Sequence, residues 1–153
     1  MELLMIKKKT NRIQNIKLYK IIIFLILLTS FNIVRAQQKT GIGSIDTLIF
    51  DLKTNMEGYL HENNPPYVQD DIDLCIATLS DYVVKVLDTK SKDEGMKLVK
   101  ATVLKLNELN EKCDYSLIET NEREQIAQII ILAGHEKNYN AIDEDITEEW
   151  REW

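Results

Sequence analysis

Residues 126–134 read IAQIIILAG, and this stretch decides the fold class. Its side chains are apolar almost all round, which is typical of a helix buried in a protein core. The β-branched run 129–131 is also compatible with a strand. The polar lead-in with helical spacing, and Gly134 as a helix stop, favour a helix. We therefore interpret the stretch as the most buried helix of an all-α protein.

Three further segments carry apolar residues at helical spacing and predict helices at about 44–61, 70–87 and 91–113. The sequence 63–66, Asn-Asn-Pro-Pro, must end the first of them, because proline lacks a backbone donor and restricts the residue before it. The expected fold is a small bundle of about four helices plus a short C-terminal helical turn.

Polar residues predict where these helices begin. Ser44 is a candidate N-cap for the first helix, because a serine hydroxyl accepts a hydrogen bond from a free backbone N–H. Ser91 and Glu94 have the spacing of a capping box at the start of the third helix. Asn121 and Glu124 have the same spacing before the fourth helix, so we expect that helix to begin there.

The first 36 residues have the three parts of a secretory signal peptide: a basic start, an apolar run over 21–34 and small residues before a cut. We expect cleavage between Ala36 and Gln37, which leaves residues 37–153 as a single helical domain. The apolar run covers 14 residues, whereas a spanning helix needs about 20. A retained membrane anchor is the alternative. Either way, export to the periplasm or the extracellular space is expected.

Removal of the signal changes the charge of the protein. The first 36 residues hold 7 of the 19 Lys and Arg but 1 of the 25 Asp and Glu, so the mature chain has 12 basic and 24 acidic side chains and a formal charge of −12. This argues against binding to nucleic acid or, after signal cleavage, to anionic membranes. A well-solvated surface is the simpler explanation of the charge, and a basic protein partner is the functional one.

Cys75 and Cys113 are the only cysteines. In an oxidising compartment they can form a disulfide, which would stabilise the fold by a few kcal/mol. Both also fall on apolar helical faces, so two buried free thiols are the alternative, and the sequence leaves the choice open. Two cysteines without a nearby pair of histidines do not predict a metal site. We find no cofactor motif and expect no cofactor.

His61 and His135 are the only histidines, and each lies near the end of a predicted helix. A histidine there interacts favourably with the helix dipole, which is the simpler role for both. A hydrolase that uses these histidines or a pair of acidic residues is an alternative function. A shared histidine site requires that the two helix ends lie together in space.

The sequence DITEEWREW, residues 145–153, contains both tryptophans of the chain. If a helical turn begins at Ile146 or Thr147, Trp150 and Trp153 share one face of it. We expect both indoles to dock on the core of the protein, with Trp150 further inside. Contact with a partner is the alternative, because tryptophan and arginine are frequent hot spots of protein interfaces.

Residues 117–134 and 145–153 together resemble a group of small uncharacterised bacterial helical proteins, some of them suspected immunity proteins encoded beside toxins. Members pair an Ile-Glu-Thr-x-x-Arg-Glu start of an apolar helix with a Trp-Arg-x-Trp ending. The positions that match are Glu119, Thr120, Arg123, Glu124, Trp150, Arg151 and Trp153. The resemblance implies an α-helical fold and no known activity, so no catalytic residue is carried over. It also suggests that Arg123 or Arg151 bridges the helix and the C-terminus through an acid.

The sequence therefore predicts an exported helical protein that is not an enzyme and acts by binding another protein, as an immunity protein or an inhibitor does. An envelope hydrolase and a structural envelope component that associates with itself are the alternatives. The sequence does not determine the oligomeric state.

Overall fold

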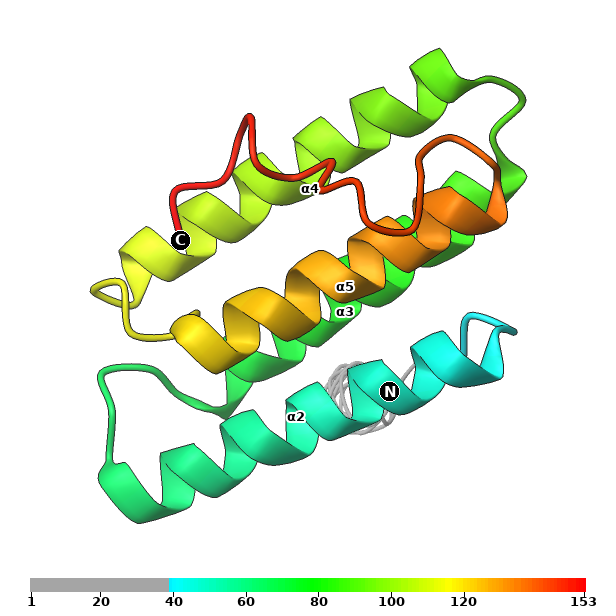
Figure 1. Ribbon diagram of the computed structural model, residues 1–153. Coiled ribbons are helices and arrows are strands. Elements are labelled where there is room, and N and C mark those ends of the chain that lie inside the picture. The colour runs from blue at the N-terminus through cyan, green and yellow to red at the C-terminus, as the bar shows by residue number, and fades with distance from the viewer. Residues whose placement is uncertain (1–38) are drawn as a thin grey trace, which may run out of the picture. The chain divides into compact units, whose positions relative to one another are not determined.

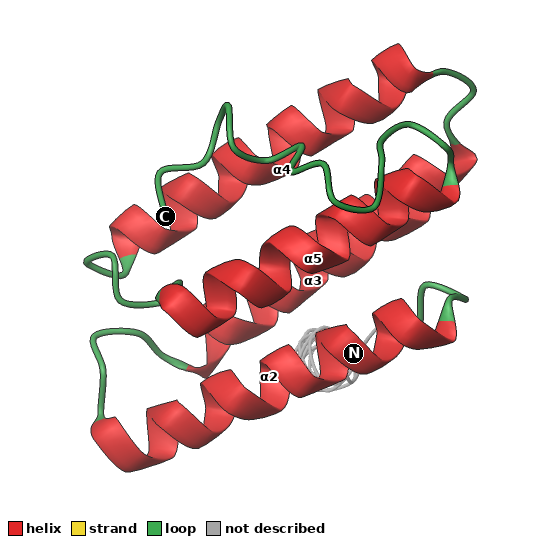
Figure 2. Cartoon of the chain, viewed as in Figure 1, coloured by secondary structure: helices red, strands yellow, loops and turns green. Residues whose placement is uncertain are grey.

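The computed structural model describes residues 39–153, which form four α-helices and no strand (Figures 1 and 2). The helices are α2 (Gly43–Asn63), α3 (Gln69–Asp88), α4 (Lys92–Lys112) and α5 (Thr120–Glu136), each antiparallel to the one before it. The all-α bundle predicted from the sequence is confirmed. The predicted signal peptide, residues 1–36, and its cleavage between Ala36 and Gln37 lie outside the described residues.

Helix α3 is the centre of the bundle, because it packs against α2, α4 and α5, while α2 also packs against α5. The stretch 126–134 supplies Ile126, Ile129 and Ile130, which are fully buried. Ile131 and Leu132 are only half-buried, so one side of α5 reaches the surface. The prediction that this is the most buried helix is wrong, because α3 has ten buried residues among its 20 and α5 has six among its 17.

The chain after α5, residues 137–153, has no regular helix and is called the C-terminal segment below. It runs along the molecule between α4 and α5 (Figure 1). Ile146 and Thr147 are buried. The Arg151 N–H donates to the Thr147 carbonyl oxygen at 3.1 Å, which closes one helical turn. The short C-terminal turn expected from the sequence is therefore present, and it is anchored by buried side chains.

Two of the predicted helix starts can be compared with the structure directly. Ser91 caps α4 as predicted, since its Oγ accepts a hydrogen bond from the Glu94 N–H at 3.3 Å. The other half of the predicted capping box is not formed, because the Glu94 carboxylate accepts from the Lys90 N–H at 2.8 Å. Ser44 does not cap α2, which begins before it. Instead the Asp46 carboxylate accepts a hydrogen bond from the Thr40 backbone N–H at 2.7 Å and ties the preceding chain to the first turn. No side chain caps the first turn of α2.

The predicted capping pair Asn121 and Glu124 is wrong by two residues. Helix α5 begins at Thr120, and the Glu119 backbone N–H donates to the Glu122 carboxylate at 3.3 Å. Both pairs have the same spacing in the sequence. Local spacing therefore could not tell the true helix start from the false one.

Asn110 on α4 holds the chain that leads into α5. Its side-chain Oδ1 accepts hydrogen bonds from the backbone N–H groups of Leu117 at 3.1 Å and Ile118 at 2.9 Å. Both of these residues are buried. Asn110 therefore holds the chain directly before Glu119, the residue that precedes the first residue of α5.

Gly134 does not end α5 as predicted, because the helix continues to Glu136. The left-handed residue is Asn138, with a φ of 57°. The Tyr139 N–H donates to the Gly134 carbonyl oxygen at 3.1 Å, and the Asn138 N–H donates to the His135 carbonyl oxygen at 2.7 Å. This is the Schellman pattern, with asparagine in the position that glycine usually takes.

Gly134 and Gly95 instead make room for the C-terminal segment. A Cβ on Gly95 would lie 2.6 Å from two ring carbons of Tyr139. A Cβ on Gly134 would overlap the Asn140 side chain and lie 3.1 Å from Ile146 Cδ1. One glycine is on α4 and the other on α5, so the absence of a side chain lets the segment approach both helices.

We expect Gly95→Ala and Gly134→Ala each to lower the free energy of unfolding by about 1–3 kcal/mol, because the added methyl group overpacks a filled site. Gly58→Ala is the matched control. A Cβ there meets nothing within 4 Å, and alanine in a helix is better than glycine by roughly 0.5–1 kcal/mol. Urea unfolding followed by circular dichroism measures all three. Equal effects at the three positions would contradict the role assigned to the two glycines.

Candidate functional site

Trp150 and Trp153 are half-buried, and both pack against the core. The Lys100 ammonium lies 5.9 Å from the centroid of the Trp150 ring, and the Arg151 guanidinium carbon lies 5.9 Å from that of Trp153. Both distances are within the range of cation–π contacts. The indoles are thus arranged for docking on the protein itself, while part of each remains at the surface. A role of either indole in binding a partner stays a prediction.

Asn107 on α4 holds the end of the C-terminal segment. Its Nδ2 donates to the Trp150 carbonyl oxygen at 2.8 Å, and its Oδ1 accepts from the Glu152 N–H at 3.3 Å. Asn107 is buried, with 8% of its surface exposed. One amide side chain therefore satisfies two backbone groups of the segment on either side of Arg151, much as a neighbouring peptide would.

Arg151 forms an ion pair with Asp145 at 2.7 Å. Asp145 Oδ1 also accepts hydrogen bonds from the Thr147 backbone N–H at 2.9 Å and its hydroxyl at 2.6 Å. Burial opposes ionisation of Asp145, but the Thr147 hydrogen bonds and the Arg151 charge outweigh it and lower the pKa of the carboxyl. The suggested bridge between Arg151 and the fourth predicted helix is wrong, because its acid lies in the same segment.

Arg123 makes no ion pair within residues 39–153, so the suggested bridge through Arg123 is also not formed. Arg123 and Arg151 do lie together, because both line an open groove of about 610 Å³ between α5 and the C-terminal segment. We call this the C-terminal groove. Its lining residues are Arg123, Glu124, Ala127, Gln128, Ile131, Leu132, Ile142, Asp145 and Arg151.

The C-terminal groove combines an apolar floor with charged side chains. Ile142 is 55% exposed, and Ile131 and Leu132 across from it on α5 are half-buried. Because the Arg151–Asp145 pair fixes the segment that follows Ile142, this isoleucine is presented on an ordered backbone. An apolar centre with a polar rim is the usual build of a protein-binding surface.

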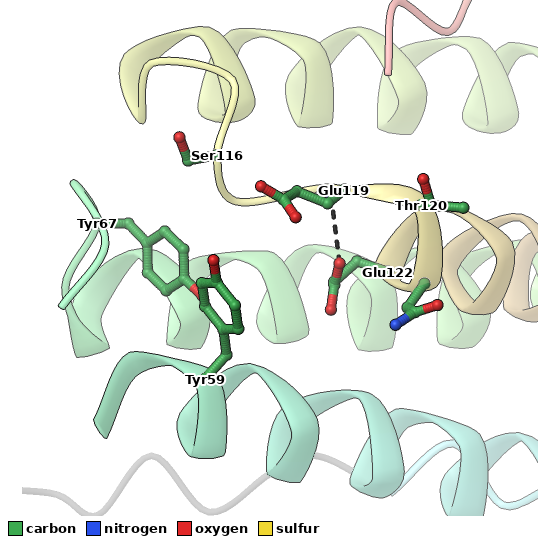
Figure 3. Close-up of a pocket in the computed structure, with 7 residues that line it drawn as sticks. Tyr59, Tyr67, Ser116, Glu119, Thr120 and Glu122 are labelled. Atoms are coloured by element: carbon green, nitrogen blue, oxygen red, sulfur yellow. Dashed lines mark hydrogen bonds between the residues drawn. The ribbon is translucent and has the colours of Figure 1, made fainter. Parts of the chain in front are cut away.

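Glu119, another residue of the predicted interaction set, lies elsewhere. It lines a pocket of about 140 Å³ at the start of α5, together with Tyr59, Tyr67, Ser116, Thr120, Asn121 and Glu122 (Figure 3). We call this the tyrosine–glutamate pocket. Burial raises the pKa of Tyr67 to about 12, with the charge of Glu122 as the next cause.

Cys75 and Cys113 are both buried and are free thiols in the structure. Burial raises the pKa of Cys75 to about 12, and the nearby Cys113 contributes to this shift. Burial also raises the pKa of Cys113, with the Asp71 charge as the next cause. Both thiols are therefore protonated at neutral pH and poorly reactive in the folded protein. Their pairing in an oxidising compartment stays a prediction.

Asp71 is a buried acid close to Cys113. The Lys112 ammonium lies 2.7 Å from its Oδ1, and the Val68 N–H donates to its Oδ2 at 3.1 Å. The hydrogen bond from Lys112 is the main reason that the pKa of Asp71 is lowered; burial opposes it and the Val68 hydrogen bond adds to it. The pair joins the start of α3 to the end of α4.

His61 and His135 do not form a site. His61 is near the end of α2, beside the start of α5, whereas His135 is in the last turn of α5. With a rise of about 1.5 Å per residue, the 16 residues from Glu119 to His135 span roughly 24 Å. Helices α2 and α5 end at opposite ends of the bundle (Figure 1), and each histidine is in the last turn of its helix. The shared histidine site is therefore not formed in residues 39–153.

Within residues 39–153, no group of three or more His, Cys, Asp or Glu side chains is arranged to hold a metal ion. In the same range, no helix is both long enough and apolar enough to cross a membrane.

The residues that hold the C-terminal segment and the start of α5 were not predicted from the sequence. Asn107, Asn110 and Gly95 lie inside helical patterns, where they add nothing to an apolar stripe. Three polar or flexible residues inside one otherwise amphipathic helix were the available signal, because each lowers helix propensity. Their partners in space could not be read from that signal.

No family model matches this chain, and comparison with curated proteins and with solved structures gives no significant match either. The resemblance to small bacterial helical proteins of immunity type therefore stays a prediction.

We expect Asn107→Ala to lower the free energy of unfolding by about 1–3 kcal/mol, because two backbone groups of the C-terminal segment lose their buried partner. Lys105→Ala, at an exposed position of the same helix, should change it by no more than about 0.5 kcal/mol. Thermal and urea unfolding of the three proteins test this. If Asn107→Ala and Lys105→Ala changed the free energy of unfolding equally, the hydrogen bonds of Asn107 would not hold the C-terminal segment.

We expect Asp71→Asn to lower the free energy of unfolding at pH 7 by about 1 kcal/mol, because a charge favoured by Lys112 and by the start of α3 is removed. The pKa of Asp71 in the folded protein lies below its ordinary 3.8. Its contribution is therefore complete above about pH 4 and is lost as the pH falls through the folded-state pKa.

Urea unfolding of wild type and variant at pH 7, 5 and 3 measures this dependence. Asp70→Asn is the control, because Asp70 is exposed in the same helical turn, and it should cost less. A difference between wild type and Asp71→Asn that grew toward pH 3 would contradict the assignment.

Proposed function

We propose that this chain is exported and that its mature part, residues 37–153, acts by binding another protein, as an immunity protein or an inhibitor does, and not by catalysis. The observation that carries the proposal is the C-terminal groove. It presents Ile142, 55% exposed, between charged side chains on an ordered segment.

The groove suits a protein partner better than a small substrate. Its single fully usable cation is Arg123, since Arg151 is held by Asp145. Asp145 in turn is occupied by Thr147 and Arg151, so it is poorly placed to act as a base. What remains is apolar surface on α5 and Ile142, whose burial by a partner is favourable by roughly 25 cal/mol per Å².

The charge of the mature chain indicates the kind of partner. With 24 acidic and 12 basic side chains in residues 37–153, its surface attracts a basic protein. Such attraction raises the association rate and weakens with added salt. The proposed export rests on the basic and apolar pattern of the first 36 residues.

The test uses protein purified after expression of the full chain, so that any processing takes place in the cell. Mass spectrometry of its N-terminus should give Gln37. The purified protein is used as bait for basic proteins of a periplasmic extract, and each captured protein is compared between wild type and Ile142→Asp. We expect Ile142→Asp to weaken binding at least tenfold, because a charge is placed in the buried centre of the interface.

Leu104→Asp is the matched control, because Leu104 is an exposed apolar residue on α4, 42% exposed and outside the groove. It should leave binding unchanged. Equal binding by wild type and Ile142→Asp would contradict the role of the groove. Capture of no protein at any salt concentration would contradict the proposed function. So would the result that Ile142→Asp alters only the association of the protein with itself.

A further inference from the structure

The tyrosine–glutamate pocket is built from three parts of the chain. Tyr59 comes from the last turns of α2, Tyr67 from the connection between α2 and α3, and Glu119 and Glu122 from the start of α5 (Figure 3). The two tyrosine rings and the two carboxyl groups thus approach the same space from opposite sides. Because these elements are fixed by the packing of α5 against α2 and α3, the pocket is preformed.

Tyr67 carries a polar group that the fold does not satisfy. Its side chain lines the pocket and is 3% exposed, and its hydroxyl makes no hydrogen bond to residues 39–153. The hydroxyl is not one of the fully enclosed polar atoms without a partner, so it faces the open space of the pocket. It is therefore free to accept a hydrogen bond from a ligand group in the pocket.

The carboxyl groups of the pocket determine which charge a ligand must have. Glu119 and Glu122 have no ion-pair partner among the described residues, and no basic side chain lines the pocket. Glu122 uses one oxygen to accept the Glu119 N–H at 3.3 Å, which leaves its other oxygen available. Although a helix N-terminus favours anions, two carboxylates already occupy this one. The pocket therefore favours a cation with hydrogen-bond donors.

The volume limits the size of the ligand. A space of about 140 Å³ is close to the roughly 150 Å³ of a cavity that holds one benzene molecule. Pockets for drug-sized molecules measure about 300–1,000 Å³. The end of one side chain fits, and an aromatic wall adds cation–π attraction for a positive group.

We propose that the tyrosine–glutamate pocket receives the ammonium or guanidinium group of a lysine or arginine side chain of the protein partner. This inference rests on the proposed function and names the group by which the partner is recognised. The pocket adjoins the C-terminal groove along α5, since Glu119 and Arg123 are one helical turn, about 6 Å, apart. One partner of ordinary interface size covers both.

The test is an NMR titration of the purified protein with Nα-acetyl-lysine methylamide and with Nα-acetyl-arginine methylamide. The norleucine analogue, which lacks the charge, is the ligand control. We expect the cationic compounds to bind with dissociation constants on the order of millimolar. They should shift the ring signals of Tyr59 and Tyr67 and the backbone signals of residues 116–122. Norleucine should not.

Glu119→Gln and Glu122→Gln should each weaken this binding about tenfold, while Glu108→Gln, an exposed acid on α4, should not change it. Tyr67→Phe should weaken it severalfold and tests the hydroxyl without changing the charge. Equal binding of norleucine, or equal effects of the Glu108 and Glu119 variants, would overturn the proposal. So would binding of calcium chloride at the pocket without binding of either amine.

The same variants separate this inference from the proposed function. If Glu119→Gln leaves partner capture intact while Ile142→Asp abolishes it, the pocket is not a recognition site and the proposed function stands. If the amines bind but no protein is captured, the pocket takes free organic cations and the protein-partner assignment falls.

Discussion

The packing of α4 is the constraint on which the rest of the structure depends. Helix α4 packs closely on α3, and the side of it that faces α5 is covered by residues from outside the four helices. The C-terminal segment supplies that cover with Ile146 and Thr147, both buried. Asn107 holds the segment at one end by hydrogen bonds. At the other end the Tyr139 ring packs against Gly95, which has no side chain in the way. The groove and the ordered position of Ile142 both follow from this.

The fold class could be predicted from the sequence, because four apolar stripes of helical period leave little choice of secondary structure. The helix ends were harder. Ser91 was correct because its cap is entirely local, whereas Asn121 was wrong because Glu119 and Glu122 have the same spacing as Asn121 and Glu124 and are the pair used at the start of α5. Gly134 looked like a stop, since sequence alone does not distinguish a residue needed for its backbone angles from one needed for lack of a side chain.

The candidate sites were predictable in part. Arg123 and Arg151 were each singled out as a possible bridge, and the structure brings both to one groove, although neither forms the acid bridge to the helix that was expected. Glu119 was singled out with them but lies in a separate pocket. Tyr67 could not have been found from the sequence. Its importance comes from burial next to the start of α5, about 50 residues later in the chain.

The Asn107 side chain and the two glycines that contact the C-terminal segment also limit which substitutions this protein can accept in evolution. Asn107 uses both its donor and its acceptor on the backbone of the segment, so aspartate, which has lost the donor, and leucine, which has neither group, cannot replace it. Gly95 and Gly134 cannot accept larger side chains while Tyr139 and Asn140 stay in place. Distant relatives should therefore keep glycine at the positions of Gly95 and Gly134 and asparagine at the position of Asn107, even where the surface acids and the tryptophans have diverged.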